Sequence, residues 1–234
     1  MIKSAPTISG RMLLPLIRRG KTINRAWMEL QLRGTSVDGL VLDLGSGASS
    51  YFQTMQRGAD AHLLRVDVCL EAKPDFVTDL EDLLPLASGA VNGVLLLNVL
   101  EHLYHYEEVL CEIGRVLRPG GLLVMFVPFL IAVHTARRGG FFTDDYFRYT
   151  ASTLHRLLTG PANFAGPVQI RACAFGPFAA AANLIIPELR FGWLKATAAG
   201  CAFMLDDVLR QLRQGREGVS RSEWVIGYYV EAIK

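Results

Sequence analysis

The fold is decided by residues 41–52, VLDLGSGASSYF, in which a short apolar run ends in an acid and opens into two glycines one residue apart. Leucine and valine fill the run, so it predicts a buried strand. Gly45 and Gly47 permit turn conformations that other residues resist, and Ser49 or Ser50 can cap a helix behind the turn. In an α/β sheet, a turn of this kind is where a nucleotide-like ligand binds.

The 234 residues suffice for one substantial domain and are somewhat few for two. A hydrophobic fraction of 51% and a charged fraction of 20% exclude a disordered chain. The formal net charge of +2 is too small to indicate a polyanionic partner, and basic and aromatic residues form no interleaved patch. We therefore expect no nucleic-acid partner.

The four cysteines, Cys69, Cys111, Cys173 and Cys201, form no C-x-x-C pair, so neither a zinc site nor a disulfide framework is indicated. The apolar run at residues 12–17 contains a proline and precedes basic residues without a small-residue cleavage pattern. We expect no export and a cytoplasmic location.

Short apolar runs alternate with helical patterns from residue 40 onward, which is typical of a parallel sheet with crossover helices. The helical patterns lie at 109–117 and 151–158. The predicted strands are 40–44, 62–66, 76–77, 93–97, 122–127, 168–174 and 224–233.

Two segments lie outside this alternation. Residues 1–38 predict a helical extension, in which Asn24 can cap a helix that runs to about Arg33 and either packs on the domain or covers its ligand site. Within the single domain expected at 39–234, residues 175–213 predict an apolar helical insertion. Charges interrupt this insertion too often for a membrane span. It either packs on the domain, or residues 175–205 contact an apolar substrate, a membrane surface or a second copy of the chain.

Polar residues follow the predicted strands where each strand ends: Asp43, Asp67, Asp79 and Asn98. The carboxyl ends of parallel strands meet at one edge of the sheet, where ligands bind. Ser50 replaces the third glycine of the dinucleotide motif G-x-G-x-x-G, and the G-K-[ST] of a phosphate-binding loop is missing. Asp67 stands about 20 residues beyond the glycines, where a carboxylate can bind both ribose hydroxyls. This combination indicates a nucleoside without phosphates.

Five segments over roughly 40–128 resemble, in order, the class I S-adenosylmethionine-dependent methyltransferases of the type 11 kind. They are the glycine turn (41–47), VDV (66–68), TDL (78–80), NVLEH (98–102) and RVLRPGG (115–121). The resemblance implies a Rossmann-like α/β fold. Its sheet has seven mostly parallel strands with an antiparallel last strand, helices cover both faces, and a helical insertion precedes the last strand.

The resemblance also implies S-adenosylmethionine as the cofactor, bound by Asp43, Gly45, Gly47, Asp67, Asp79, Leu80 and Asn98. In the family, the glycines and the Asn98 position lie beside the methionine part. Asp67 corresponds to the ribose site. Asp79 and the Leu80 amide correspond to the adenine site.

His134 and the later DYFRYT (145–150) resemble a segment of bacterial members that lies over the methyl group. His102, His134 and Tyr146 are accordingly our candidates for a base or a positioning group. Alternatively, Tyr146 and Tyr149 only pack this loop and Arg148 pairs with an acid.

His102 and His105 stand three residues apart with Glu101 adjacent, which suggests a metal. No third ligand with recognisable spacing lies nearby, so we expect no metal.

The sequence therefore predicts methyl transfer by in-line displacement to a small-molecule, glycan or lipid-linked acceptor. The alternative is a non-catalytic subunit with a methyltransferase fold that binds the cofactor or a partner. An NAD-dependent oxidoreductase is disfavoured by Ser50 and by the lack of a catalytic Tyr-x-x-x-Lys.

Overall fold

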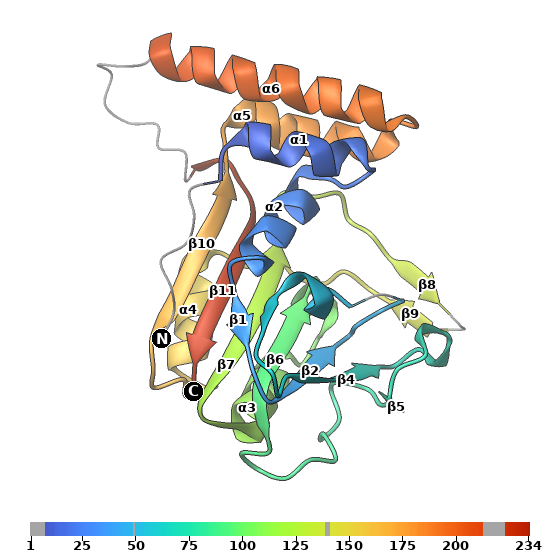
Figure 1. Cartoon of the computed structure of the whole chain (residues 1–234), viewed down its shortest axis with the longest axis vertical. Coiled ribbons are helices and arrows are strands. Elements are labelled where there is room, and N and C mark those ends of the chain that lie inside the picture. The colour runs from blue at the N-terminus through green and yellow to red at the C-terminus, as the bar shows by residue number, and fades with distance from the viewer. Residues whose placement is uncertain (1–7, 49, 139–140, 213–222) are drawn as a thin grey trace.

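A computed structural model describes residues 8–48, 50–138, 141–212 and 223–234 (Figure 1). A seven-stranded sheet forms its centre, with the strand order β10-β11-β7-β6-β2-β4-β5. The strands are β2 (Leu40–Leu44), β4 (His62–Asp67), β5 (Phe76–Val77), β6 (Val91–Leu97), β7 (Leu117–Pro128), β10 (Val168–Ala174) and β11 (Val225–Ile233). β11 pairs antiparallel with both β7 and β10, whereas the pairs among β7, β6, β2, β4 and β5 are parallel. The predicted fold class is confirmed.

Alternate side chains of the buried strands divide the core between the two faces of the sheet. Leu42 and Leu44 point to the face covered by α3 (Tyr106–Val116) and α4 (Ala151–Thr159). Val41 points to the opposite face, which is covered by the N-terminal helices and by the helices before β11. Helices therefore cover both faces, as the resemblance implied.

The N-terminal extension and the apolar insertion pack against each other, although they are far apart in the sequence. Figure 1 shows α1 (Gly10–Arg18) and α5 (Pro177–Ile185) beneath the long helix α6 (Gly192–Leu212). A Cβ on Gly10 would lie only 2.4 Å from the ring of Phe203, so α1 and α6 approach closely. Phe203 also packs against Phe175, with ring centroids 5.0 Å apart.

The helix predicted to follow Asn24 is α2 (Ile23–Leu32). Its cap position is Thr22, so Asn24 lies inside the helix and is not its cap. Most of α2 is buried, as expected of a packing helix. Apolar side chains nevertheless remain exposed on α5 and α6: Phe178, Leu184, Ile185, Trp193, Met204, Leu205 and Val208. In the part of the chain that the structure describes, no helix has both the length and the apolar character of a membrane span.

The prediction of a helix directly behind the glycine turn is wrong. Ser50 Oγ accepts a hydrogen bond from Phe52 N (3.0 Å), and only the 3₁₀ turn η1 (Phe52–Thr54) follows. The chain then enters the short strand β3 (Gln56–Arg57), which pairs with β1 (Ser36–Val37). Ser49, the other expected cap, lies outside the described residues. Beyond Pro128, the strands β8 (Ala136–Arg138) and β9 (Phe141–Thr143) form a hairpin.

Candidate active site

The glycine turn after β2 folds back onto the neighbouring strand β4. The backbone amides of Gly45 and Ser46 both donate to the carbonyl oxygen of Val66, at 2.9 and 3.3 Å. Gly45 has φ of +67°, and a Cβ there would lie 2.6 Å from Val99 Cγ2. Both the backbone conformation and the space therefore require glycine at this position.

Asp67, at the end of β4, contacts this turn directly. Its Oδ2 accepts from Gly47 N at 2.8 Å, and its Oδ1 accepts from Cys69 N at 2.9 Å. These two bonds fix the carboxylate, while each oxygen keeps a lone pair for a further donor. The predicted neighbourhood of Asp67 and the glycine turn is confirmed.

Arg65 is a part of this arrangement that the sequence argument did not include. Its Nη2 donates to the carbonyl oxygens of Gly47 (2.6 Å) and Ala72 (2.9 Å), so it ties together the two loops around Asp67. The available signal was the charge itself, because Arg65 interrupts an otherwise apolar run just before Asp67.

Asp43 is buried at the end of β2, with 3% of its surface exposed. Burial raises the pKa of its carboxyl group from 3.8 to about 6, although the hydrogen bond with Ser50 and the charge of Arg65 lower it. The nearby carboxylate of Asp67 raises this pKa further.

The residues proposed for the adenine end lie beyond β5. Thr78 N donates to the carbonyl oxygen of Asp67 (3.2 Å), so this segment adjoins the end of β4. Asp79 is exposed, and its Oδ1 accepts from Glu81 N at 3.0 Å. Leu80 is buried, and its amide donates to no described residue.

Asn98 follows β6 in a left-handed conformation, with φ of +57°. Its side-chain amide lies 3.7 Å from Met28 Sδ, and Met28 is a buried residue of α2. The N-terminal extension therefore contributes a side chain that contacts Asn98.

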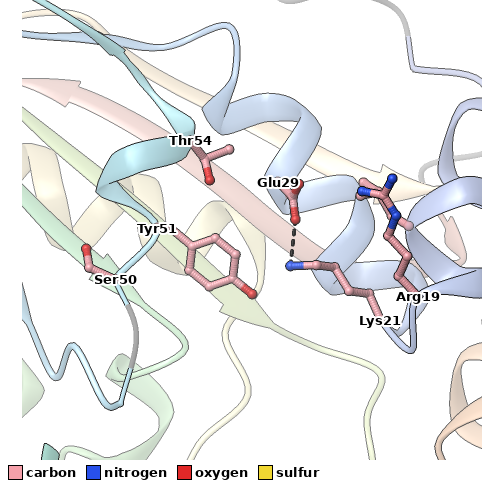
Figure 2. A pocket seen from close by; sticks show the side chains of 7 residues that line it. Arg19, Lys21, Glu29, Ser50, Tyr51 and Thr54 are labelled. Atoms are coloured by element: carbon pink, nitrogen blue, oxygen red, sulfur yellow. Dashed lines mark ion pairs between the residues drawn. The ribbon is translucent and has the colours of Figure 1, made fainter.

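A cavity of about 320 Å³ opens between the N-terminal extension and the residues directly behind the glycine turn (Figure 2). Lys21 Nζ pairs with Glu29 Oε2 at 2.6 Å and lies 4.9 Å from the ring centroid of Tyr51. The lining residues are Leu16, Arg19, Lys21, Glu29, Ser50, Tyr51 and Thr54.

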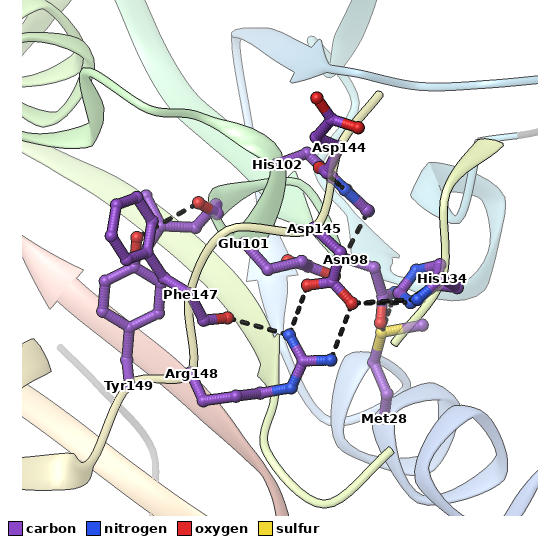
Figure 3. A network of polar contacts seen from close by, with 11 residues as sticks. Met28, Asn98, Glu101, His102, His134, Asp144, Asp145, Phe147, Arg148 and Tyr149 are labelled. Atoms are coloured by element: carbon purple, nitrogen blue, oxygen red, sulfur yellow. Dashed lines mark hydrogen bonds and ion pairs between the residues drawn. The ribbon is translucent and has the colours of Figure 1, made fainter. Parts of the chain in front are cut away.

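A polar network lies beyond β6 and β7 (Figure 3). The carboxylate of Asp145 is fully buried; it accepts from both terminal nitrogens of Arg148 and from His134 N at 3.1 Å. Burial alone would raise the pKa of Asp145, but the bonds with Arg148 hold it below its ordinary value. The ring of His134 packs edge-on against that of His102, with centroids 4.9 Å apart. Two of the three predicted catalytic residues are thus in contact.

Tyr146, the third predicted catalytic residue, contacts Asp144 and Tyr104. Its hydroxyl donates to Asp144 Oδ2 at 3.4 Å, and its half-exposed ring packs against Tyr104. Arg148 pairs with an acid, and Tyr149 is buried with its hydroxyl on Leu100 O (3.3 Å). For Arg148 and Tyr149, the structure therefore favours the alternative in which Arg148 pairs with an acid and the tyrosine only packs the loop.

Glu101 is fully buried in the 3₁₀ turn η3 (Leu100–His102). Burial raises the pKa of its carboxyl group to about 8; its own backbone amide lowers this pKa without reaching hydrogen-bond geometry. Glu101, His102 and His134 each offer a metal-ligand atom, and these atoms lie within 4.8 Å of one another. We expected no third metal ligand near His102, and this expectation is wrong. His134 lies beside His102 because β6 and β7 are neighbouring strands. The ring of His105 instead packs on Tyr104.

The strand order, the antiparallel last strand and the acid-bearing glycine turn are those of the class I S-adenosylmethionine-dependent methyltransferase fold. Residues 42–125 match the family model described as methyltransferase domain. No curated protein matches the sequence.

Solved structures share the fold. A Thermotoga maritima S-adenosylmethionine-dependent methyltransferase is 13% identical, with a TM-score of 0.54 and 91% of each chain covered. A complex of the Haloferax volcanii Trm112 methyltransferase activator with a methyltransferase gives 15% identity and a TM-score of 0.53, covering 90% of this chain and 88% of the other. Haemonchus contortus phosphoethanolamine N-methyltransferase 2 is 12% identical, with a TM-score of 0.52, and the match covers 97% of this chain and 60% of the other. At such identities the likeness concerns the fold.

Proposed function

We propose that this methyltransferase moves the methyl group of S-adenosylmethionine to a small-molecule, glycan or lipid-linked acceptor. The observation that carries the proposal is the carboxylate of Asp67, which the amides of Gly47 and Cys69 hold at the carboxyl edge of the sheet. A carboxylate fixed in this way, with lone pairs remaining, suits the two hydroxyls of a ribose.

The remaining cofactor contacts follow the same edge of the sheet. The amide of Leu80, which donates to none of the described residues, and the exposed carboxylate of Asp79 suit the hydrogen-bonding edge of adenine. The glycine turn and Asn98 border the methionine part, and Asp43 places a buried acid near the positive charge of the cofactor. When bound, the cofactor supplies an already activated methyl group, so the protein chiefly has to position the acceptor and exclude water.

His102 is the best-placed candidate to accept a proton from the acceptor. Its Nδ1 lies 2.7 Å from the carbonyl oxygen of Asp144, which can only accept, so Nδ1 carries the hydrogen and Nε2 keeps its lone pair. Burial lowers the pKa of His102 and the adjacent His134 lowers it further, although the hydrogen bond with the Asp144 carbonyl raises it. The net lowering favours the neutral ring, which is the form that can accept a proton. His134 and Tyr146 remain positioning candidates.

The exposed apolar side chains of α5 and α6 support the lipid-linked end of this acceptor range. Phe178, Ile185 and Trp193 are each more than 40% exposed. Exposed apolar groups gathered on neighbouring helices suit an apolar chain or a membrane surface. Sedimentation with phospholipid vesicles tests this point; a chain that stays in the supernatant favours a free small-molecule or glycan acceptor.

Isothermal titration with S-adenosylmethionine tests the cofactor site. We expect the wild type to bind and Asp67→Ala to bind at least tenfold more weakly, because hydrogen bonds to a charged group contribute about 1.5–3 kcal/mol each. Asp60→Ala, an exposed acid in the turn before β4, is the matched control and should bind like the wild type. No binding by the wild type, or equal binding by Asp67→Ala, would contradict the proposal.

Formation of S-adenosylhomocysteine in the presence of cell extract tests turnover. We expect product with the wild type and none above background with Asp67→Ala. Cofactor binding without product would favour the non-catalytic alternative.

A further inference from the structure

Glu101 is a buried acid whose carboxylate oxygens make no hydrogen bond with any described residue, although the charges of Arg148 and Arg25 act on it. Its side chain is 1% exposed, and neither carboxylate oxygen has a hydrogen-bond partner among the described residues. Buried carboxylates in proteins are normally paired, hydrogen-bonded or bound to a metal. The contacts among the described residues therefore do not account for the burial of these two oxygens.

Two imidazole rings face this carboxylate. Nε2 of His102 lies 3.8 Å from Glu101 Oε1, and His134 brings a third ligand atom within 4.8 Å of the other two. His102 follows β6 and His134 follows β7, which are neighbouring parallel strands. The carboxyl ends of these two strands thus bring the three side chains together from segments about 30 residues apart.

The neighbours of both rings leave Nε2 available for a ligand. Nδ1 of His102 donates to the carbonyl oxygen of Asp144 (2.7 Å). Nδ1 of His134 lies 3.2 Å from Asp145 Oδ2, and Arg148 holds that carboxylate in place (Figure 3). Metal-binding histidines typically donate their other ring nitrogen to a carbonyl or a carboxylate in this way.

We propose that Glu101, His102 and His134 bind a divalent transition-metal ion through one carboxylate oxygen and two imidazole nitrogens. This donor set suits Zn²⁺, Mn²⁺, Fe²⁺ or Co²⁺ and is poor for Mg²⁺ or Ca²⁺, which prefer oxygen ligands. Bonds of about 2.0–2.2 Å place ligand atoms roughly 3–3.5 Å apart on one ion. Binding therefore draws the three side chains together by about an ångström, a change within the reach of side-chain rotation.

Three protein ligands leave coordination positions open. The second part of the inference rests on the proposed function: an oxygen of the methyl acceptor occupies one of these positions. The ion then orients the acceptor and makes its hydroxyl more acidic. In the metal-bound protein the ion takes the place of His102 as the group that assists proton loss, because Nε2 of His102 is then a ligand and has no lone pair for a proton.

The experiment uses the full chain, treated with a chelator, freed of it and titrated with Co²⁺, whose visible absorption reports its ligands. We expect one Co²⁺ per chain for the wild type and at least tenfold weaker binding for Glu101→Gln and His134→Ala. His105→Ala, an exposed histidine outside the cluster, is the matched control and should bind like the wild type. His134 is 44% exposed, so its loss should leave the melting temperature nearly unchanged and keep the comparison valid.

Wild-type protein without stoichiometric Co²⁺ binding, or His134→Ala binding as tightly as His105→Ala, would overturn the metal site. Titration of the same preparations with S-adenosylmethionine separates this failure from that of the proposed function. Cofactor binding without Co²⁺ binding refutes the metal site alone, whereas Co²⁺ binding without cofactor binding refutes the methyltransferase proposal alone.

Discussion

The acid at the end of β2 should destabilise the fold at neutral pH, and Asp43→Asn tests this directly. Asp43 is 3% exposed, and its pKa in the folded protein is about 6 against 3.8 for the free group. That difference corresponds to about 3 kcal/mol of lost stability when the carboxylate is charged. Asparagine has nearly the same shape, keeps an oxygen for Ser50 and carries no charge. We therefore expect the variant to unfold with up to about 3 kcal/mol more free energy.

The effect should depend on pH with a defined sign. A raised pKa means that the folded state binds the proton more tightly than the unfolded state, so protonation favours folding. This contribution is fully present below pH 3.8, is lost as the pH rises through 6 and is then constant. The difference in unfolding free energy between Asp43→Asn and wild type should be about half as large at pH 5 as at pH 8.

Urea unfolding of both proteins at pH 5 and pH 8, followed by circular dichroism, measures the difference. The matched control is Asp60→Asn, an exposed acid whose replacement should change stability by no more than about 0.5 kcal/mol at either pH. A destabilised Asp43→Asn protein, or a gain that is equal at both pH values, would refute the reasoning.

Two further substitutions test the backbone around the site. Gly45→Ala should destabilise by about 2–3 kcal/mol, because φ is +67° and the new methyl group would meet Val99 at 2.6 Å, whereas Gly120→Ala (φ +78°, open space) should lose only about 1 kcal/mol; equal losses in urea unfolding would contradict the steric argument. Thr150 Oγ1 caps α4 by accepting from Thr153 N (3.3 Å), so Thr150→Ala should lower the unfolding free energy by about 1 kcal/mol. Ser152→Ala, in the exposed first turn of α4, should change it by less than about 0.5 kcal/mol, and a similar loss in both variants would argue against the cap.

Two strands of the central sheet could be located from the sequence without error. β2 and β10 have the predicted bounds, because each is a compact run of strand-forming residues between turn signals. β7 begins five residues earlier than predicted, at Leu117. Its first residues include a proline and two glycines, which resemble a turn, yet Leu117 pairs with Val91 across an irregular register and Gly120 N donates to the carbonyl oxygen of Lys234. These are tertiary contacts that local propensity does not contain.

The site was predictable to the extent that it follows from strand order. Residues just after parallel strands had to meet at one edge, so Asp67 could be placed beside the glycine turn. The same rule places His134, after β7, near His102, after β6. Spacing along the chain does not reveal this pair of possible metal ligands, because the two histidines are 32 residues apart. The isolation of Glu101 could not be predicted, because it depends on how the segment around Asp145 folds over η3.

The two acids with raised pKa values end up on neighbouring strands of the sheet. Asp43 is the last residue but one of β2, Glu101 follows β6, and β2 pairs directly with β6. In both cases burial is the largest cause of the shift, so the fold keeps two carboxylates where water cannot stabilise their charge. Under the two proposals made above, positive charge brought in by a ligand would relieve this cost: the cationic cofactor proposed beside Asp43, and the metal ion proposed at Glu101. The same burial that destabilises the empty protein should therefore strengthen the binding of cations at this edge, which is the expected arrangement for a site that handles a sulfonium group.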